Sequence, residues 1–491
     1  MTLQARAFKS NAQVSTFSAN FHFRRARGIP GGALKEDHGA SPPEQLLQSV
    51  WQHQRLLREQ LKTLDGHPVR ILHPGFKNFE AGPDFRGAMV RIGSQPIRTG
   101  DVEIDLRPGG WQAHGHDRNP AFKNVVLHVI WDGQSPAAPG IPTLVLRGTL
   151  DASLDDLNAA FGHDSLKSLP EDLQGQCCAP LRDLPPDSLT QLLHESAQDR
   201  WAGKAGHFQA RARQVGWEQA LWEGLFRALG YKQNVWPMQS LAELRPHWLS
   251  LPCTALACQA RLFGISGLLP SELTRAQSGA DGYLRRIWDQ WWREREQFSD
   301  LLLPRELWRF NSLRPANHPQ RRLALAAHWL AAGDLLPKLE KWFTTTLPDA
   351  QLLNSLLQIL QAKRDDFWSW HWTFRSAPLA RPQPMLGAAR VTDLAINVIL
   401  PWFWMRAVEG GNESLRRVAE HRYLVWPAAE DNSLLRLARQ RLLGGAKARS
   451  LRGAAAQQGL LQILRDFCEH SNAICDNCQF PKIVRDWNLK K

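Results

Sequence analysis

The hydrophobic periodicity changes once along the chain, near residue 180, and this change limits the folds that the chain can adopt. Before it, short apolar runs stand between Pro and Gly residues, as in the strands of a small sheet. After it, apolar residues recur every three or four positions over long stretches, and strand-like runs nearly vanish. We therefore expect an α+β protein, in which a small α-β-β-β-α-β core precedes a large, mainly α-helical region.

The predicted core begins with an amphipathic helix over residues 43–63, which Ser41 and two prolines introduce. The expected strands cover residues 69–73, 84–92, 101–106, 124–131 and 143–147, with a loop and a short helix between the third and the fourth. The patterns divide the chain into four parts: a disordered basic arm (1–40), an α/β domain (41–165), a helical domain (166–465) and a Cys-rich C-terminal segment (466–491).

The composition excludes several classes of protein. Of the 491 residues, 43% are hydrophobic and 22% are charged, which is inconsistent with a disordered or fibrous chain. The longest apolar run, Leu394–Met405, is interrupted by Asn397 and Pro401 and is shorter than the roughly 18 residues of a membrane helix. Seven cysteines in so long a chain do not suggest a disulfide framework. We expect a cytoplasmic protein that does not bind a membrane.

The net charge of +13 is unevenly distributed. Residues 41–180 carry 13 basic and 16 acidic residues, whereas residues 181–491 carry 41 basic and 29 acidic residues. A basic, Arg-rich region suits nucleic acid, although an Arg bias also follows from a GC-rich genome. Within this region, the segment 314–322 (RPANHPQRR) is interpreted either as a phosphate contact beside a helix or as a tight connection between helices.

Acidic residues occupy two of the predicted strands. Asp84 lies in the motif Gly-Pro-Asp-Phe at the entry to the second strand, and Glu103 and Asp105 lie on the third. Because side chains alternate along a strand, Glu103 and Asp105 share one face, and Asp84 comes from the neighbouring strand. Such a group of carboxylates suits Mg²⁺ or Mn²⁺, which activates water and neutralises charge on a phosphodiester. The alternative role is turn chemistry and a solvated strand face.

The element order and the Pro83-Asp84…Glu103-Ile104-Asp105 pattern resemble the PD-(D/E)xK nuclease superfamily. The resemblance implies a Mg-dependent nuclease with metal ligands at Asp84, Glu103 and Asp105. Asp105 stands where that superfamily usually has the Lys that positions the attacking water. Lys123 or a histidine is a candidate substitute.

Histidines gather near these acids in the sequence. His114 and His116 follow the third strand, and His128 lies within the fourth. We expect His114 and His116 to join the catalytic group as a base, a metal ligand or a phosphate contact, or else to cap a turn. His128 is interpreted as a core histidine or as a further member. Glu44, at the start of the first helix, is either a fourth acid or a partner of the helix dipole.

Over roughly residues 43–485 the chain also resembles a bacterial family known as domain of unknown function 2851. The resemblance is carried by the Gly-Pro-Asp-Phe motif, by Trp111, His114, His116 and His128, and by motifs at residues 229–234, 262–264 and 314–319. The family usually has His at the position of Asp105. The family name implies one coherent protein and assigns no activity.

The last 25 residues contain Cys468, Cys475 and Cys478. Their spacing suits zinc or an iron–sulfur cluster, with His470, Cys177 or Cys178 as a fourth ligand, or else three unmetallated thiols. Cys253 and Cys258 lie on an apolar helix and are expected in the core.

Two functions follow from these patterns. The first is a metal-dependent nuclease or nuclease-like protein that binds DNA or RNA, in which Arg side chains from residues 181–491 surround the acidic pocket. The alternative is a catalytically inactive scaffold or interaction protein that retains the nuclease fold. The sequence does not specify the strandedness of the substrate, the polarity of cutting or the oligomeric state.

Overall fold

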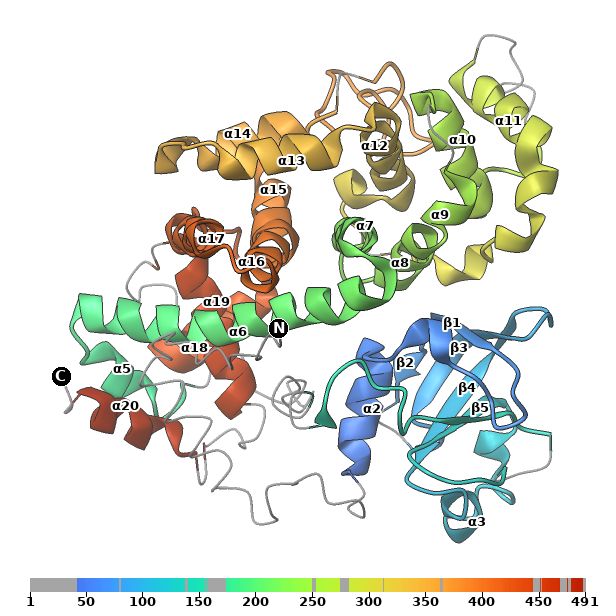
Figure 1. Ribbon diagram of the computed structural model, residues 1–491, viewed down its shortest axis with the longest axis horizontal. Helices are drawn as coiled ribbons and strands as arrows, with labels where there is room; N and C mark the ends of the chain where they lie inside the picture. Colours follow the sequence, from blue (N-terminus) through green and yellow to red (C-terminus); the bar gives the residue numbers. More distant parts are fainter. Residues whose placement is uncertain are drawn as a thin grey trace, which may run out of the picture. The chain divides into compact units, whose positions relative to one another are not determined.

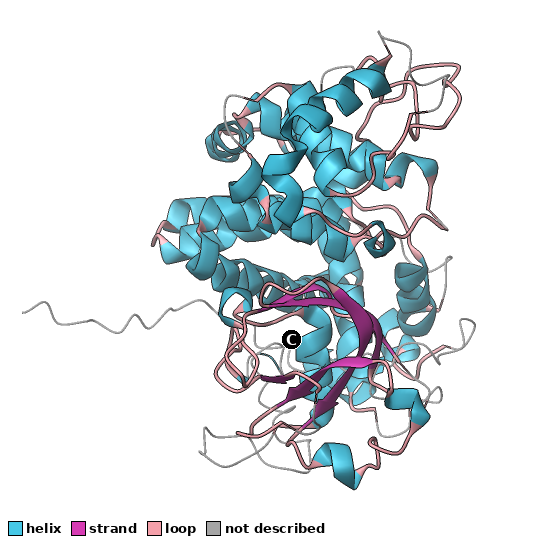
Figure 2. Cartoon of the chain, turned by 90° about the vertical axis from the view of Figure 1, so that its right-hand side faces the viewer, coloured by secondary structure: helices cyan, strands magenta, loops and turns pink. Residues whose placement is uncertain are grey.

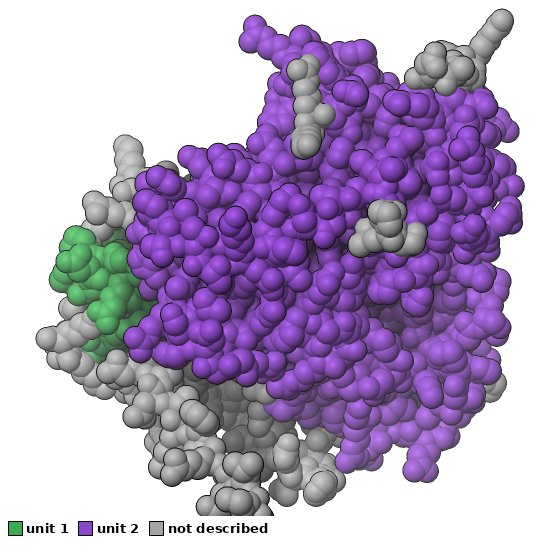
Figure 3. Space-filling model, turned by 45° about the horizontal axis from the view of Figure 1, so that its top comes forward, with its two compact units in different colours: residues 1–40, 162–203, 430–491 green, residues 41–161, 204–429 purple. Residues whose placement is uncertain are grey.

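The computed structural model describes residues 42–488, except 79–80, 137–139, 155–156, 158–173, 250–252, 274–281, 312, 363–364, 445–450, 452, 469–474 and 476–477. The predicted basic arm, residues 1–40, lies outside the described residues. The chain forms two compact units, which Figure 3 colours green and purple. Unit 1 comprises residues 1–40, 162–203 and 430–491, and unit 2 comprises residues 41–161 and 204–429.

Unit 2 begins with a curled sheet of six strands (Figure 2). The strands are β1 (Val69–His73), β2 (Phe76–Lys77), β3 (Phe85–Ile92), β4 (Arg98–Asp105), β5 (Val125–Ile130) and β6 (Thr143–Val145). Their order is β1-β3-β4-β5-β6, with β2 paired to the start of β3. The pairs β1–β3, β2–β3 and β3–β4 are antiparallel, whereas β4–β5 and β5–β6 are parallel.

Helix α2 (Glu44–His53) covers one face of this sheet (Figure 1). Its apolar side chains, among them Leu47, Val50 and Trp51, share a core with Val102 and Ile104 of β4. Burial of these side chains stabilises the contact by roughly 1.5–3 kcal/mol each. The opposite face of the sheet carries a smaller cluster around Trp111 and Phe122.

The predicted helix over residues 43–63 is wrong in its second half. The helix ends at His53 because Gln54 adopts a left-handed conformation with φ 52°. The backbone beyond it pairs with other strands, through bridges from Leu56 to Leu150 and from Thr63 to Leu144. Apolar residues after position 54 therefore reach the core from extended backbone, which accounts for the apparent helical spacing.

The rest of unit 2 and the described part of unit 1 are mostly helical, so the mixed α+β class predicted from the sequence is confirmed. The helices after the sheet, together with the short α3 within it, are α3 (Gly110–Ala113), α5 (Cys178–Arg182), α6 (Pro186–Val215), α7 (Trp217–Leu229), α8 (Val235–Glu243), α9 (Arg245–Trp248), α10 (Ala255–Ile265), α11 (Tyr283–Glu294), α12 (Pro319–Ala332), α13 (Leu335–Thr344), α14 (Leu352–Leu360), α15 (Ala388–Leu394), α16 (Leu400–Glu409), α17 (Glu413–Val425), α18 (Ser433–Leu443), α19 (Gly453–Ile463) and α20 (Phe480–Asn488).

Helix α8 connects the helical part of unit 2 to the sheet. It packs beside β1, as Figure 1 shows, and its Glu243 accepts a hydrogen bond of 3.1 Å from Arg58. On α6, Arg211 pairs with Glu59 at 2.7 Å and with Glu223 at 2.6 Å. Arg211 and Glu223 are both buried, whereas the Glu59 side chain is 49% exposed. Loss of either buried partner would leave an uncompensated charge, so the buried pair specifies how α6 and α7 pack.

An apolar helical stretch runs from α15 through a π-helical turn (η8, Ala395–Ile399) into α16. Among the described residues, this one helical stretch, Ala388–Glu409, has the length and the apolar composition that crossing a membrane would require. However, 72% of its apolar window is buried inside the protein, as in the core helix of a globular protein.

Two buried arginines at the start of α12 hold the segment before α15 in place. Arg321 is fully buried and donates to the carbonyls of Trp368, His371, Gln383 and Pro384. Its neighbour Arg322 donates to the Met385 carbonyl at 2.8 Å and to Asn317 Oδ1 at 2.7 Å. These contacts favour the interpretation of segment 314–322 as a tight connection between helices.

We expect Arg321→Lys to lower the free energy of unfolding by about 3 kcal/mol, because lysine cannot reach four carbonyls with one planar group. The midpoint of urea unfolding, followed by tryptophan fluorescence, measures the change. Arg375→Lys changes an exposed arginine of the same region and should leave the midpoint nearly unaltered. Equal midpoints for the two variants would contradict this role of Arg321.

Candidate functional site

The acids that the sequence singles out lie at the start of β3 and the end of β4. Phe85 pairs with Val102 in the antiparallel register, so Asp84 faces Glu103 one position further along. The backbone N–H of Asp84 donates to Glu103 Oε2 at 3.1 Å, and the N–H of Ile104 donates to Asp84 Oδ2 at 3.0 Å. Each of the two carboxylates therefore accepts a hydrogen bond from the main chain that carries the other carboxylate.

Alternation along β4 separates apolar from acidic side chains. Val102 and Ile104 point into the core beneath α2, whereas Glu103 and Asp105 lie on the opposite face. Both carboxylates are buried, with relative exposures of 7% for Glu103 and 2% for Asp105. Buried carboxylates at one sheet face are costly unless hydrogen bonds or a cation compensate them.

Three histidines supply part of that compensation. His128, the β5 neighbour of Glu103, contacts Asp105 Oδ2 through Nε2 at 2.9 Å. Asp105 Oδ1 lies 3.4 Å from Nδ1 of His114, and Glu103 Oε1 lies 3.1 Å from Nε2 of His116. The described residues therefore bring both predicted catalytic histidines to the predicted acids, and His128 joins them.

An aromatic cluster positions these imidazoles. The Trp111 ring meets those of His116 and His128 edge to face, each at a centroid distance of 5.4 Å. The Phe122 ring packs against two of these rings, with centroid distances of 3.9 Å to His116 and 5.9 Å to Trp111. Because the rings are fixed by packing, their nitrogens face the carboxylates without further ordering.

The first turn of α2 completes the group. Gln48 donates through Nε2 to Asp84 Oδ1 at 2.8 Å and to Glu44 Oε1 at 3.2 Å. The four-residue spacing from Glu44 to Gln48 puts both on one side of the helix, a signal that was present in the sequence. We call Glu44, Asp84, Glu103, Asp105, His114, His116 and His128 the acid–histidine cluster.

Burial and mutual repulsion change the protonation of the acids. Burial, together with the charges of Glu44 and Asp105, raises the pKa of Asp84 to about 7, although the hydrogen bond from Ile104 lowers it. Burial, followed by the charge of Asp84, raises the pKa of Glu103 to about 9. The pKa of Glu44 is also raised, by burial and by Asp105. Carboxylates that resist ionisation in this way would be stabilised by a bound cation.

Burial lowers the pKa of the His116 imidazole, so its neutral form is favoured near pH 7. Neutral imidazole is the form that binds a metal ion or accepts a proton. Side-chain exposure is 10% for His116 and 55% for His114, so the cluster meets solvent at His114.

One subset of the cluster is close enough together to hold a metal ion. Ligand atoms of Asp105, His114 and His116 all lie within 4.8 Å of one another. Imidazole suits Zn²⁺, Fe²⁺ and Ni²⁺, whereas carboxylate suits Mg²⁺ and Mn²⁺. A set of two imidazoles and a carboxylate therefore fits a transition ion better than Mg²⁺. Asp84 and Glu103 are placed next to this subset through His116 and the β3–β4 contacts.

The lysine that the nuclease pattern would have at position 105 has a candidate substitute on β2. Lys77 pairs in register with Phe85, and its charge lowers the pKa of the neighbouring Asp84. Lys123, considered from the sequence, is exposed after a short 3-10 turn, η2 (Pro120–Phe122). Lys77 was missed because a two-residue strand leaves no pattern in the sequence.

Gly110 allows the loop after β4 to close over Asp105. A β-carbon at Gly110 would lie 2.3 Å from Asp105 Oδ1 and 2.6 Å from its Cγ, closer than any real contact. Because Gly110 has no side chain, the start of α3 can lie this close to the Asp105 carboxylate.

We expect Gly110→Ala to push the Asp105 side chain aside and to weaken Mn²⁺ binding at least about tenfold, since metal ligands tolerate little displacement. Isothermal titration calorimetry with Mn²⁺ measures the loss. Gly109→Ala is the matched control, because a β-carbon there meets nothing within 4 Å and the backbone is already helical, with φ −65°. The same affinity in both variants would contradict the argument.

The three cysteines predicted to hold zinc or iron–sulfur lie in unit 1. Cys468 ends the π-helical turn η9 (Leu464–Cys468), and Cys475 and Cys478 precede α20. The backbone N–H of Cys478 donates to the Cys475 carbonyl at 3.2 Å, which closes a turn between them. His470 lies outside the described residues.

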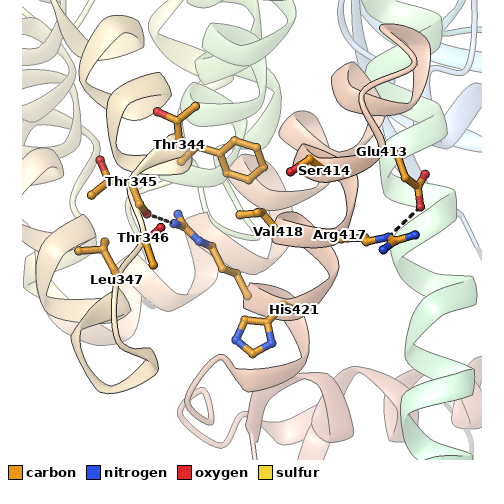
Figure 4. Close-up of a pocket in the computed structure, with 11 residues that line it drawn as sticks. Thr344, Thr345, Thr346, Leu347, Glu413, Ser414, Arg417, Val418 and His421 are labelled. Atoms are coloured by element: carbon orange, nitrogen blue, oxygen red, sulfur yellow. Dashed lines mark hydrogen bonds and ion pairs between the residues drawn. The ribbon is translucent and has the colours of Figure 1, made fainter.

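A cavity of about 600 Å³ lies elsewhere in unit 2, between the end of α13 and helix α17 (Figure 4). Its basic side chains have partners within the protein. Arg422 donates to the Thr345 carbonyl at 2.7 Å, Arg417 donates to Glu413 at 3.0 Å, and His421 contacts Asp349 at 2.9 Å. The acid–histidine cluster therefore remains the better candidate for chemistry.

Comparison with known proteins adds a family but no activity. A family model described as "Protein of unknown function (DUF2851)" matches residues 44–432, from the start of α2 to the residue before α18. Neither the curated proteins nor the solved structures include a match. The matched range contains the whole acid–histidine cluster and excludes Cys468, Cys475 and Cys478. The chain belongs to the DUF2851 family.

Proposed function

We propose that this protein is a metal-dependent hydrolase of phosphodiesters, a nuclease-like enzyme that acts on DNA or RNA. The observation that carries the proposal is the convergence of two strand-borne acids, Asp84 and Glu103, with the Asp105–His114–His116 set. Carboxylates from adjacent strands beside imidazoles form a donor set that fits a divalent cation.

The donor set fits Mn²⁺, and Mg²⁺ remains an alternative through the carboxylates alone. Asp105, His114 and His116 would hold the ion, with Asp84 and Glu103 beside it. The bound ion would supply an activated water and offset negative charge on the phosphodiester. The neutral His116 imidazole is suited to bind the ion, because its lowered pKa disfavours the protonated form. Lys77, beside Asp84, would contribute the positive charge that Asp105 cannot.

An exposed ring and two basic side chains at or near β2 support a nucleic-acid substrate. Phe76 of β2 is 46% exposed, and the Arg309 guanidinium lies 4.8 Å from the centre of its ring. Lys77 follows Phe76 on the same short strand, and its charge lowers the pKa of Asp84. An exposed ring stacks on bases, and Arg and Lys contact phosphates. Arg309 belongs to the basic C-terminal part of the chain, whose arginines are predicted to surround the acidic pocket.

The alternative proposal is a scaffold that retains the fold and has lost the reaction. Asp105 favours it, because the residue stands where the nuclease pattern has lysine. A scaffold would bind nucleic acid or protein without a need for metal.

The test is a titration of Mn²⁺ and Mg²⁺ against labelled DNA and RNA, single- and double-stranded, with purified full-length protein. We expect cleavage that needs the ion and that Asp84→Ala abolishes. Asp132→Asn is the matched control, since Asp132 is a half-exposed carboxylate at the end of β5 that pairs with Arg147 outside the cluster. Binding that needs no metal and leads to no cleavage would favour the scaffold, and cleavage that survives Asp84→Ala would contradict the proposed site.

A second readout concerns the substrate. If phosphates are contacted by Lys77 and Arg309, binding measured without metal should weaken steeply as salt increases, because each contact releases counterions. Lys77→Gln combined with Arg309→Gln should flatten this dependence. If the protein binds neither DNA nor RNA even at low salt, the proposed nucleic-acid substrate is contradicted.

A further inference from the structure

Four cysteines, one near residue 177 and three near the C-terminal end of the sequence, lie in the same part of unit 1. A β-carbon at Gly175 would lie 3.4 Å from the Sγ of Cys177 and 3.7 Å from the Sγ of Cys475, so these two sulfurs approach the same point. Cys177 and Cys468 belong to one hydrophobic core, and Cys478 packs against it. All four are free thiols rather than disulfides.

The main chain holds two of the C-terminal cysteines together. The backbone N–H of Cys478 donates to the Cys475 carbonyl at 3.2 Å. Cys478 therefore lies next to Cys475, whose sulfur approaches the same point as the sulfur of Cys177.

A buried arginine faces the same thiols. Arg441, near the end of α18, is fully buried, and its Nη2 donates to Cys475 Sγ at 3.1 Å. It also lowers the pKa of Cys468 by its charge and by a hydrogen bond. A guanidinium inside a protein is stabilised by neighbouring negative charge, and a metal bound by four thiolates carries a net negative charge.

The neighbouring Cys178 does not belong to this group. Its Sγ lies 3.1 Å from the position of a β-carbon on Gly444, at the end of α18. It is as buried as Cys177, with 4% relative exposure for each. The two adjacent cysteines therefore differ in surroundings and not in burial.

We propose that Cys177, Cys468, Cys475 and Cys478 form a four-thiolate metal site, with Arg441 offsetting its charge. The ligand is a thiophilic metal centre, either a single Zn²⁺ or an iron–sulfur cluster, because both take four cysteine thiolates. Three ligands come from the C-terminal segment and the fourth from the start of α5, so the metal would join two parts of unit 1 that are remote in the sequence. The site is independent of the proposed phosphodiester chemistry.

The experiment measures metal on the full-length protein carrying Asp105→Asn, so that the acid–histidine cluster contributes less. Anaerobic preparation, elemental analysis, sulfide determination and visible absorption distinguish the two centres. We expect either about one zinc per chain without visible absorption or about four irons with sulfide and a broad visible band. Cys177→Ser should remove at least half of that metal, whereas Cys178→Ser, the matched control, should retain it.

A second measurement covers the case in which Cys177→Ser fails to fold. The metal-free wild-type chain is titrated with Co²⁺, whose thiolate complexes absorb strongly at wavelengths that carboxylate and imidazole complexes lack. Appearance of these bands, and their loss in Cys478→Ser, supports the site. Protein that contains neither zinc nor iron and gives no thiolate bands with Co²⁺ overturns the proposal, as does full metal content in Cys177→Ser.

Discussion

Replacement of Asp105 by Asn should lower the affinity for Mn²⁺ at least about 100-fold and abolish metal-dependent cleavage. One carboxylate here faces two imidazoles, with His128 at 2.9 Å and His114 at 3.4 Å. The amide would offer one neutral oxygen and would present an N–H₂ group to a histidine nitrogen. The metal would lose a charged ligand, and both imidazoles would lose the partner that orients them.

Isothermal titration calorimetry gives the affinity, and the cleavage assay gives the activity. Asp132→Asn makes the same chemical change at the end of β5 and should bind Mn²⁺ as the wild type does. Circular dichroism should show both variants folded. An Asp105→Asn protein that keeps its Mn²⁺ affinity would move the metal site away from this set of residues.

Glu103→Gln should stabilise the metal-free protein at alkaline pH while it weakens metal binding. The raised pKa values mean that the fold favours the protonated forms of Asp84 and Glu103. Their contribution to the free energy of unfolding is therefore fully present below about pH 4. It is lost as the pH rises through about 7 for Asp84 and about 9 for Glu103.

Three carboxylates, those of Asp84, Asp105 and Glu44, repel a negative charge on Glu103. The imidazole of His116, whose neutral form is favoured, lies beside it. Glutamine at position 103 has no charge to repel, so the gain at pH 9 should be about 1–3 kcal/mol and should vanish at pH 4. Urea unfolding in the presence of EDTA at both pH values measures it. Glu306→Gln, an exposed glutamate outside the cluster, is the control.

Addition of Mn²⁺ at pH 8 should make the wild type more stable than Glu103→Gln, because the ion stabilises most the chain that binds it most tightly. A Glu103→Gln variant that is less stable than the wild type at pH 9 without metal would contradict the inference that a buried negative charge at Glu103 destabilises the fold.

The sheet and the acids on it were predictable because they depend on local rules. Strand alternation alone separated Glu103 and Asp105 from Val102 and Ile104, and the Gly-Pro-Asp turn placed Asp84 at the strand entry. The antiparallel register then required Asp84 and Glu103 to be neighbours. The mixed α+β class followed from the change in periodicity.

Other features depend on contacts that the sequence does not encode locally. The end of α2 at Gln54 is set by strand pairing of the residues that follow, and this tertiary pairing overrides their helical spacing. Lys77 acts on Asp84 from a strand of two residues, too short for any pattern. The choice of Cys177 over Cys178 depends on the direction of adjacent side chains, which the spacing of cysteines cannot give.

The composition of unit 1 has a consequence for how the chain acquires its structure during synthesis. Its hydrophobic core combines Leu181, Leu189 and Leu192 with Leu442, Leu460 and Phe480, and residues 204–429 are translated between the two sets. Because translation adds about 5–20 residues per second, synthesis of the second set follows that of the first by roughly 10–45 s. During that interval the apolar side of α6 lacks its partners and is exposed to chaperones, whereas all of unit 2 can already fold. Loss of the final helix through premature termination would therefore remove Phe480, Val484 and Trp487 from the core of unit 1 and leave the core residues of unit 2 unchanged.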